Sequence, residues 1–180
     1  MNAKTQEPTK TGAGFNRHGS SGNFRTPGDL REAVCRRFGM PELDLACSTE
    51  LRDQFGAKGL YVEQVDSLKM PWADNLVNGG LGWLNPPYRR IGPWAEKCAL
   101  EASKGAKILL LVPAAVGSNW YHDFVHQRAM TLILKGRPAF DPEHPDWGYP
   151  KDVALCCYFG FSGFDIWDWR ADVKRDEVAQ

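Results

Sequence analysis

The sequence predicts an α/β protein with one open, mostly parallel β-sheet whose last strand is antiparallel. Short apolar segments alternate along the chain with segments in which apolar residues recur at helical spacing, as expected for a sheet covered by helices. Residues 108–112 form a continuous apolar run, which is typical of a central parallel strand buried on both faces. No helical pattern separates the last two apolar segments, so we expect them to form a hairpin-like pair.

The N-terminal half is expected to contain a flexible arm, a helix and two short strands. Residues 1–22 are rich in Gly, Ser, Thr, Asn and Lys, a composition typical of disordered segments. Thr26 is positioned to cap a helix that has Pro27 in its first turn and one apolar face, and Gly39 ends this helix. The further elements predicted here are a strand at residues 43–47, a loop-rich part from residue 48 and a short strand at residues 61–62.

The C-terminal half is predicted to continue the alternation of strands and helices. Trp83 and Leu84 end a buried strand, because the two prolines after Asn85 have no N–H for a sheet ladder. Cys156 and Cys157 are adjacent in a predicted strand, so we expect two buried thiols on opposite faces of the sheet. The remaining predicted elements are helices at residues 93–103 and 120–127 and strands at residues 131–134 and 153–159.

Size, charge and cysteine content indicate a single domain in a reducing compartment. The chain has 180 residues, of which 43% are hydrophobic, enough for one domain with a core. We assign residues 1–22 to an arm, residues 23–165 to the domain and residues 166–180 to a C-terminal tail. Lys+Arg and Asp+Glu both number 22, so any binding of nucleic acid must depend on a local basic patch. The chain has five cysteines, an odd number, and they form no C-x-x-C pattern. It also shows no signal peptide and no apolar run of membrane length, so we expect a reducing, cytoplasmic location and no membrane contact.

Asn85-Pro86-Pro87-Tyr88 is the most informative stretch of the chain. Pro86 and Pro87 fix φ, and a residue before proline is pushed to extended geometry, so the loop is stiff. The Asn85 amide oxygen and the Pro86 carbonyl are then placed to accept both hydrogens of one –NH₂ group, and Tyr88 adds an aromatic face. Two such acceptors favour a tetrahedral nitrogen, whose lone pair can attack a sulfonium methyl such as that of S-adenosylmethionine. The simpler alternative is an ordinary rigid turn after a strand.

An ordered set of segments around this motif matches a known pattern. The segments are Arg25-Thr26-Pro27, Leu43 to Cys47, Asp66-Ser67-Leu68 with Trp72, Trp83 to Tyr88, Ile91 to Trp94, Leu109 to Ala114, Trp120 to Asp123 and Lys135-Gly136-Arg137. Over about residues 23–160 the chain resembles the phage-type DNA adenine methyltransferase (Dam-like) family. The resemblance implies a Rossmann-like class I methyltransferase fold and S-adenosylmethionine as methyl donor. It also implies methylation of the 6-amino group of adenine in double-stranded DNA, by a phage or prophage protein in a bacterial host.

The resemblance further implies roles for individual residues. Asp44 is expected to receive the α-amino group of the cofactor, in a variant of the cofactor motif that lacks the usual glycine-rich turn. A duplex base must leave the helix to reach such a site, and Tyr88 is expected to stack on it. The expected site residues are Asn85, Pro86, Pro87 and Tyr88 for catalysis; Thr26, Pro27, Asp44, Ala46, Cys47 and Asp66 for the cofactor; and Arg89, Arg90, Lys135 and Arg137 for DNA. Turn residues, helix caps and solvated surface charges are the simpler interpretations of these positions.

Three alternative functions stay open at this point. Cytosine, RNA adenine and protein glutamine present the same planar amino group, so each is a candidate acceptor. His122 and His126 stand four residues apart on a predicted helix, a spacing that can bind zinc in a hydrolase, although no convincing third ligand follows. The missing glycine-rich turn motivates a third hypothesis, a binding module without catalytic activity. Our main prediction includes no metal.

Overall fold

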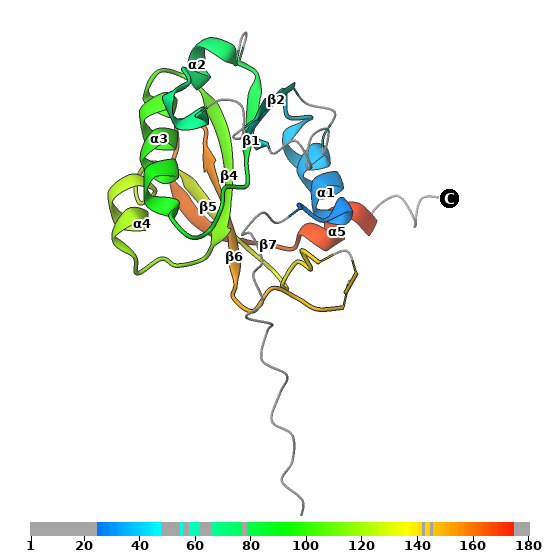
Figure 1. Cartoon of the computed structure of the whole chain (residues 1–180). Helices are drawn as coiled ribbons and strands as arrows, with labels where there is room; N and C mark the ends of the chain where they lie inside the picture. Colours follow the sequence, from blue (N-terminus) through cyan, green and yellow to red (C-terminus); the bar gives the residue numbers. More distant parts are fainter. Residues whose placement is uncertain are drawn as a thin grey trace, which may run out of the picture.

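The described residues form a seven-stranded sheet with helices on both faces (Figure 1). This computed structural model describes residues 25–47, 55, 58–61, 66–76, 79–141, 143–144 and 146–174. The arm predicted for residues 1–22 and most of the loop-rich part after residue 47 lie outside them. The strands are β1 Leu43–Cys47, β2 Lys58–Tyr61, β3 Leu81–Leu84, β4 Lys107–Pro113, β5 Met130–Leu134, β6 Val153–Tyr158 and β7 Gly163–Trp167. The helices are α1 Gly28–Phe38, the short 3₁₀ helix η1 Ser67–Lys69, α2 Trp72–Asn75, α3 Ile91–Ser103, α4 Asn119–Phe124 and α5 Trp169–Lys174.

The strand order confirms an open, mostly parallel α/β sheet. The order is β2-β1-β3-β4-β6-β5-β7. Only β6 runs against its neighbours β4 and β5 in the described sheet, and every other pair of adjacent strands is parallel. The expected antiparallel pairing of the strands near residues 131–134 and 153–159 is therefore present. The structure adds one strand to the expectation, because β7 follows β6 and lies parallel to β5 at the edge of the sheet.

The sheet separates two hydrophobic cores. Figure 1 shows α2, α3 and α4 on one face and α1 and α5 on the other. Because side chains alternate along a strand, Leu110 and Cys156 pack toward α3, whereas Leu109 and Cys157 pack toward α1. The predicted placement of the two cysteines on opposite faces is confirmed. All five cysteines are free thiols.

The first helix begins one residue later than a Thr26 cap predicts. Pro27 occupies the N-cap position, and no side chain there bonds to the helix. Thr26 is buried, and its hydroxyl accepts a hydrogen bond from Asn85. Leu30, Ala33 and Val34 form the buried face, and the helix ends at Gly39, whose φ of 90° is the left-handed geometry that favours glycine.

Residues 166–174, which the sequence analysis assigned to a tail, belong to the sheet and its helical cover. They form the end of β7 and the helix α5, which packs beside α1 (Figure 1). Trp167 and Trp169 are almost fully buried in the core on the α1 side. The helix predicted to extend to residue 127 ends at Phe124. None of the helices in the described part of the chain has the length and apolar character of a membrane span.

Candidate active site

The Asn85-Pro86-Pro87-Tyr88 motif and the predicted cofactor strand meet at one edge of the sheet. β1 and β3 are parallel neighbours, with Asp44 opposite Trp83. Two residues further along each strand come Ala46 and Asn85, so the carboxyl ends of both strands open at the same level. In open α/β sheets this is the edge where ligands bind.

The side chain of Asn85 is held by the segment that precedes α1. Strand alternation places Asn85 on the same face as Trp83, which is the α1 face. There the Asn85 Nδ2 donates a hydrogen bond to Thr26 Oγ1 over 3.4 Å. The contact joins residues 59 positions apart and brings a predicted cofactor residue against the predicted catalytic amide. Because Nδ2 serves as the donor to Thr26, the oxygen at the other end of the amide is the atom suited to accept hydrogens from a substrate.

Asp44 is a buried carboxylate on the same face of the sheet. Its Oδ1 accepts a hydrogen bond of 3.1 Å from the Ala46 backbone N–H, where the pairing of β1 with β2 is irregular between Asp44 and Cys47. Within the described residues this is the one hydrogen bond to the Asp44 carboxylate. Burial raises the pKa of Asp44 from 3.8 to about 6, and the Ala46 hydrogen bond opposes that shift only in part. A buried carboxylate with unused acceptor positions fits a cationic amino group, as the predicted cofactor role requires.

The segment containing Asp66 is fastened to β1. The Ser67 hydroxyl donates to the Leu45 carbonyl over 2.5 Å, and the Trp72 indole Nε1 donates to the Ser67 carbonyl over 2.9 Å. These bonds hold Ser67, the residue after Asp66, against Leu45 of β1. The Asp66 carboxylate itself is half exposed and forms an ion pair with Lys69 over 3.1 Å.

A buried glutamate on α3 anchors the same segment, and the sequence analysis did not identify it. Glu101 is fully buried; it accepts the Ala73 backbone N–H over 2.8 Å and pairs with Lys97 and Lys104 over 2.9 and 2.8 Å. Burial acts to raise the pKa of Glu101, but hydrogen bonds from Lys104, the Ala73 N–H and Lys97 outweigh it and lower the pKa to about 2. The sequence does contain a signal for this role. Glu101 has Lys97 and Lys104 at helical spacing and lies on the buried face of α3 with Trp94.

Tyr88 is partly buried in an aromatic cluster. Its ring meets Phe140 and Tyr149 edge-on, with centroid separations of 6.4 and 5.8 Å. Burial raises the pKa of Tyr88 well above its ordinary value, and the nearby Tyr149 adds to the effect, so the phenol is neutral at physiological pH. The cluster joins the motif to the segment between β5 and β6. Phe140 and Tyr149 were missed because they lie in a Pro- and Gly-rich stretch without periodicity.

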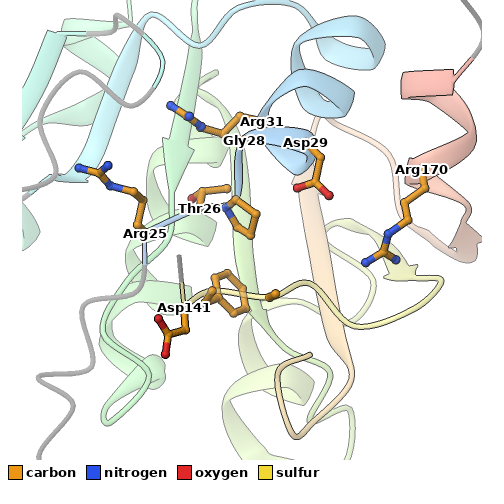
Figure 2. Close-up of a pocket in the computed structure, with 10 residues that line it drawn as sticks. Arg25, Thr26, Gly28, Asp29, Arg31, Asp141 and Arg170 are labelled. Carbon is orange, nitrogen blue, oxygen red and sulfur yellow. The ribbon is translucent and has the colours of Figure 1, made fainter. Parts of the chain in front are cut away.

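A cavity opens between the segment at residues 25–31, the segment at residues 139–141 and Arg170 (Figure 2). Its volume is about 310 Å³, and Thr26, the hydrogen-bond partner of Asn85, forms part of its wall. Pro27 and Phe140 also line it. The cavity therefore touches the predicted cofactor segment and the aromatic cluster together. Its charged lining comes from Arg25, Asp29, Arg31, Asp141 and Arg170, of which the sequence analysis named only Arg25, as part of the segment Arg25-Thr26-Pro27.

The four predicted DNA-contacting cations fall into two places. Arg89 and Arg90 are exposed in the turn between β3 and α3, next to the motif. Lys135 and Arg137 follow β5, which is separated from β3 by β4 and β6. Each of the second pair has an acidic partner: Lys135 Nζ lies 2.5 Å from Asp168, and Arg137 Nε lies 3.1 Å from Asp152.

The positions of His122 and His126 do not support the zinc-hydrolase alternative. The His122 and His126 rings stack with centroids 5.9 Å apart, but α4 ends between them. His122 is exposed, and its Nδ1 lies 3.2 Å from Asp123. In the described part of the chain, the group of three side chains placed to share a metal ion is Asp141, Glu143 and His144, and it includes neither histidine.

The comparison with known protein families agrees with this arrangement. The model of the family described as DNA N-6-adenine-methyltransferase (Dam) matches residues 17–152, a range that holds Thr26, Asp44 and the Asn85–Tyr88 motif. No match to a curated protein was found. Because the matched range spans most of the 180 residues, the chain belongs to the DNA N-6-adenine-methyltransferase (Dam) family.

Proposed function

We propose that this protein transfers a methyl group from S-adenosylmethionine to the 6-amino group of adenine in double-stranded DNA. The observation that best supports the proposal is the hydrogen bond from Asn85 Nδ2 to Thr26, beside the buried carboxylate of Asp44. It orients an amide acceptor at the sheet edge where ligands of open α/β sheets bind. The family match supports the reaction class and the substrate type.

The cofactor is assigned to the residues around β1. Asp44 receives the cationic α-amino group, because a buried carboxylate with one hydrogen bond gains most from a cation. Thr26 and Pro27 cover the methionine end. Asp66 lies at the adenosine end, where Ser67 and Trp72 hold its segment. Ala46 and Cys47 form the floor of the site, since both are buried at the end of β1.

Methyl transfer requires a nucleophilic nitrogen, and the motif supplies the conditions for one. When bound, S-adenosylmethionine would supply a methyl group on a cationic sulfur, whose C–S bond would break as the nitrogen lone pair bonds to the methyl carbon. Asn85 Oδ1 and the Pro86 carbonyl accept the two N–H hydrogens and favour a tetrahedral nitrogen with an available lone pair. Pro87 keeps the loop stiff. After transfer the nitrogen is cationic, and its extra proton passes to water.

Tyr88 is assigned to the acceptor base. An adenine in a duplex is stacked and must be flipped out to reach the motif. The Tyr88 ring, with Phe140 and Tyr149 at its edges, provides an aromatic surface for such a base. Arg89 and Arg90 beside the motif, and Lys135 and Arg137 after β5, are assigned to the DNA backbone. The arm at residues 1–22, the cytoplasmic location and the phage origin stay predictions.

The experiment that tests this function combines labelled S-adenosylmethionine, DNA and the variant Asn85→Ala. Wild-type protein is expected to label DNA and yield N6-methyl-2′-deoxyadenosine on nucleoside analysis. Asn85→Ala is expected to lose roughly 10²-fold or more in turnover, the scale seen when a positioned hydrogen-bonding group is removed, while binding of S-adenosylmethionine is kept. Asn75→Ala is the matched control, because Asn75 is exposed on α2 and, among the described residues, its side chain bonds to the Pro71 carbonyl.

Each alternative acceptor gives a different product in the same assay. Methylcytosine in DNA, methylated RNA or methylated protein in place of N6-methyladenine in DNA would contradict the assigned substrate while keeping methyl transfer. Wild-type turnover by Asn85→Ala would contradict the role of the motif. The absence of any heat or thermal shift with S-adenosylmethionine would favour a binding module without methyltransferase activity.

A further inference from the structure

The loop between β5 and β6 carries an exposed tryptophan that the proposed reaction does not use. Trp147 is 55% exposed, and its ring stacks on the His144 imidazole, with centroids 3.8 Å apart and planes 11° from parallel. Within the described residues no other ring and no cation packs on Trp147, so the face opposite His144 is open to solvent. An aromatic face open to water in this way is suited to stack on a second flat ring.

The His144 ring that supports Trp147 is itself fixed by hydrogen bonds. His144 Nδ1 lies 2.9 Å from Asp141 Oδ2, and the His144 backbone N–H donates to the Asp141 carbonyl over 3.2 Å. The Trp147 backbone N–H in turn donates to the His144 carbonyl over 3.0 Å. Both rings are therefore ordered before any ligand is bound, and little side-chain entropy is lost when a third ring stacks on them.

The loop leaves the sheet at the edge that holds the catalytic motif. β3 and β4 are parallel, and β6 is antiparallel to both β4 and β5, so β5 ends at the same edge of the sheet as β3. Where the loop begins, Arg170 donates to the carbonyls of Lys135 and Arg137 over 3.4 and 3.2 Å. Near the end of the loop, the Tyr149 N–H donates to the Pro138 carbonyl over 2.8 Å. The loop is therefore held in place at both ends.

The two residues after Trp147 contact both parts of the proposed DNA site. A Cβ added to Gly148 would lie 3.0 Å from the Arg137 Cβ, so the chain passes directly against Arg137, which is assigned to the DNA backbone. Tyr149 follows, and its ring meets that of Tyr88, which is assigned to the acceptor base, with centroids 5.8 Å apart. Trp147 is thus one residue from a backbone contact and two residues from a contact to the base site. The flat DNA group expected at such a position is a nucleobase beside the acceptor adenine.

We propose that the open face of Trp147 stacks on a DNA base that becomes uncovered when the acceptor adenine leaves the helix. The inference rests on the proposed function and adds a second aromatic surface to that of Tyr88. Flipping a base out of a duplex has an energetic cost, because stacking and pairing are lost around the gap. An aromatic side chain restores stacking with any base, since every base has a π-face. Such a contact needs no positive charge, which suits a chain whose net charge is zero.

The test measures affinity for two short labelled duplexes of the same mixed sequence, one fully paired and one with a single adenine replaced by an abasic site. The abasic site uncovers the surrounding bases without any flipping. Trp147→Ala is expected to bind the abasic duplex about tenfold more weakly than wild type does, and the paired duplex almost equally well. Trp147→Phe should keep most of the affinity, because it keeps an aromatic face. The salt slope should not change, since Trp147 carries no charge.

Phe161→Ala is the matched control, because Phe161 is an exposed aromatic residue between β6 and β7, at the opposite edge of the sheet. Equal affinities of Trp147→Ala and Phe161→Ala for the abasic duplex would overturn the stacking surface, even if the wild type methylates DNA. An equal loss on both duplexes would also overturn it, since Trp147 would then act by positioning the loop. A loss confined to the abasic duplex and restored by Trp147→Phe, in a protein that never methylates DNA, would keep the surface and refute the proposed function.

Discussion

Replacement of Asp44 by Asn tests the cofactor site through stability and binding together. Burial raises the pKa of Asp44 from 3.8 to about 6 in the folded protein, a shift of about two units. One unit corresponds to about 1.4 kcal/mol, so keeping this carboxylate ionised costs the folded state about 3 kcal/mol. Asn has nearly the same shape and keeps an oxygen for the Ala46 N–H, but it carries no charge. We therefore expect Asp44→Asn to stabilise the ligand-free protein at neutral pH.

The stability advantage of Asp44→Asn over the wild type is expected to increase with pH. Below about pH 4 the Asp44 carboxyl is protonated in both the folded and unfolded states, and the variant gains nothing. Between about pH 4 and pH 6 the unfolded state loses its proton first, so wild-type stability falls as the pH rises. Above about pH 6 both states are ionised, and the advantage of Asp44→Asn levels off near its full value. Urea unfolding at a series of pH values measures the difference in free energy of unfolding between Asp44→Asn and the wild type. Asp74→Asn is the control, because Asp74 is exposed on α2.

Cofactor binding is expected to respond in the opposite direction. Removing one member of a buried charge pair costs about 2–5 kcal/mol, so Asp44→Asn should weaken binding of S-adenosylmethionine by about 30-fold or more in calorimetry. Wild-type affinity should fall as the pH drops below about 6, because the carboxylate that we assign to the cofactor's ammonium group becomes protonated. A variant that is less stable than wild type at neutral pH and still binds the cofactor equally well would refute both the burial argument and the assigned role.

Substitutions at three further positions, Tyr88, Glu101 and Gly136, test the surroundings of the site. Tyr88→Phe should keep most methylation activity, because the neutral phenol acts through its ring, whereas Tyr88→Ala should lose about 1–3 kcal/mol of stacking, seen as a weaker affinity for DNA. Glu101→Gln should destabilise the protein by about 3 kcal/mol at neutral pH in thermal unfolding. Because the pKa of Glu101 is lowered to about 2 from 4.5, this difference should shrink as the pH falls below about 4.5; a constant difference would contradict the ion-pair account. Gly136→Ala should cost about 1–2 kcal/mol for its φ of 76°, plus the displacement of Arg170, whose Nη1 lies 2.6 Å from the added Cβ. Gly105→Ala, at φ of 99° with open space around it, isolates the backbone part, and equal losses would exclude the Arg170 contact.

The sheet could be predicted where each strand carries its own signal. The apolar run of β4 is buried at every position except Lys107, and the adjacent Cys156 and Cys157 divide between the two cores as alternation requires. β7 carries no such signal, because four of its five residues are exposed at the sheet edge and only Trp167 is buried. A strand of that kind is specified by its pairing with β5, which cannot be inferred from local periodicity.

The part of the site that could be predicted consists of residues adjacent to one another in the sequence. The prolines of the Asn85–Tyr88 motif restrict their own backbone, so its stiffness follows from the sequence itself. The roles of Glu101, Phe140 and Arg170 depend on contacts across tens of residues, such as the bond from the Ala73 N–H to Glu101 over 28 positions. Charge and aromatic character identify these residue types in the sequence, but only the fold shows which partners they have.

The hydrogen bond between Thr26 and Asn85 determines which end of the Asn85 side-chain amide can face the acceptor amino group in the proposed reaction. An amide has a donor end and an acceptor end, and a half-turn of the Asn85 side chain would point N–H groups at the substrate amino group, where they would repel it. Thr26 precedes Pro27 and is therefore biased away from helical geometry, so its hydroxyl faces Asn85 instead of capping α1. The hydroxyl accepts from Nδ2 and thereby selects the orientation in which Oδ1 is the end left to receive hydrogens. Under the proposed function, Thr26 would thus serve the acceptor half of the site as well as the cofactor half, whereas helix capping would leave its bond to Asn85 without a role.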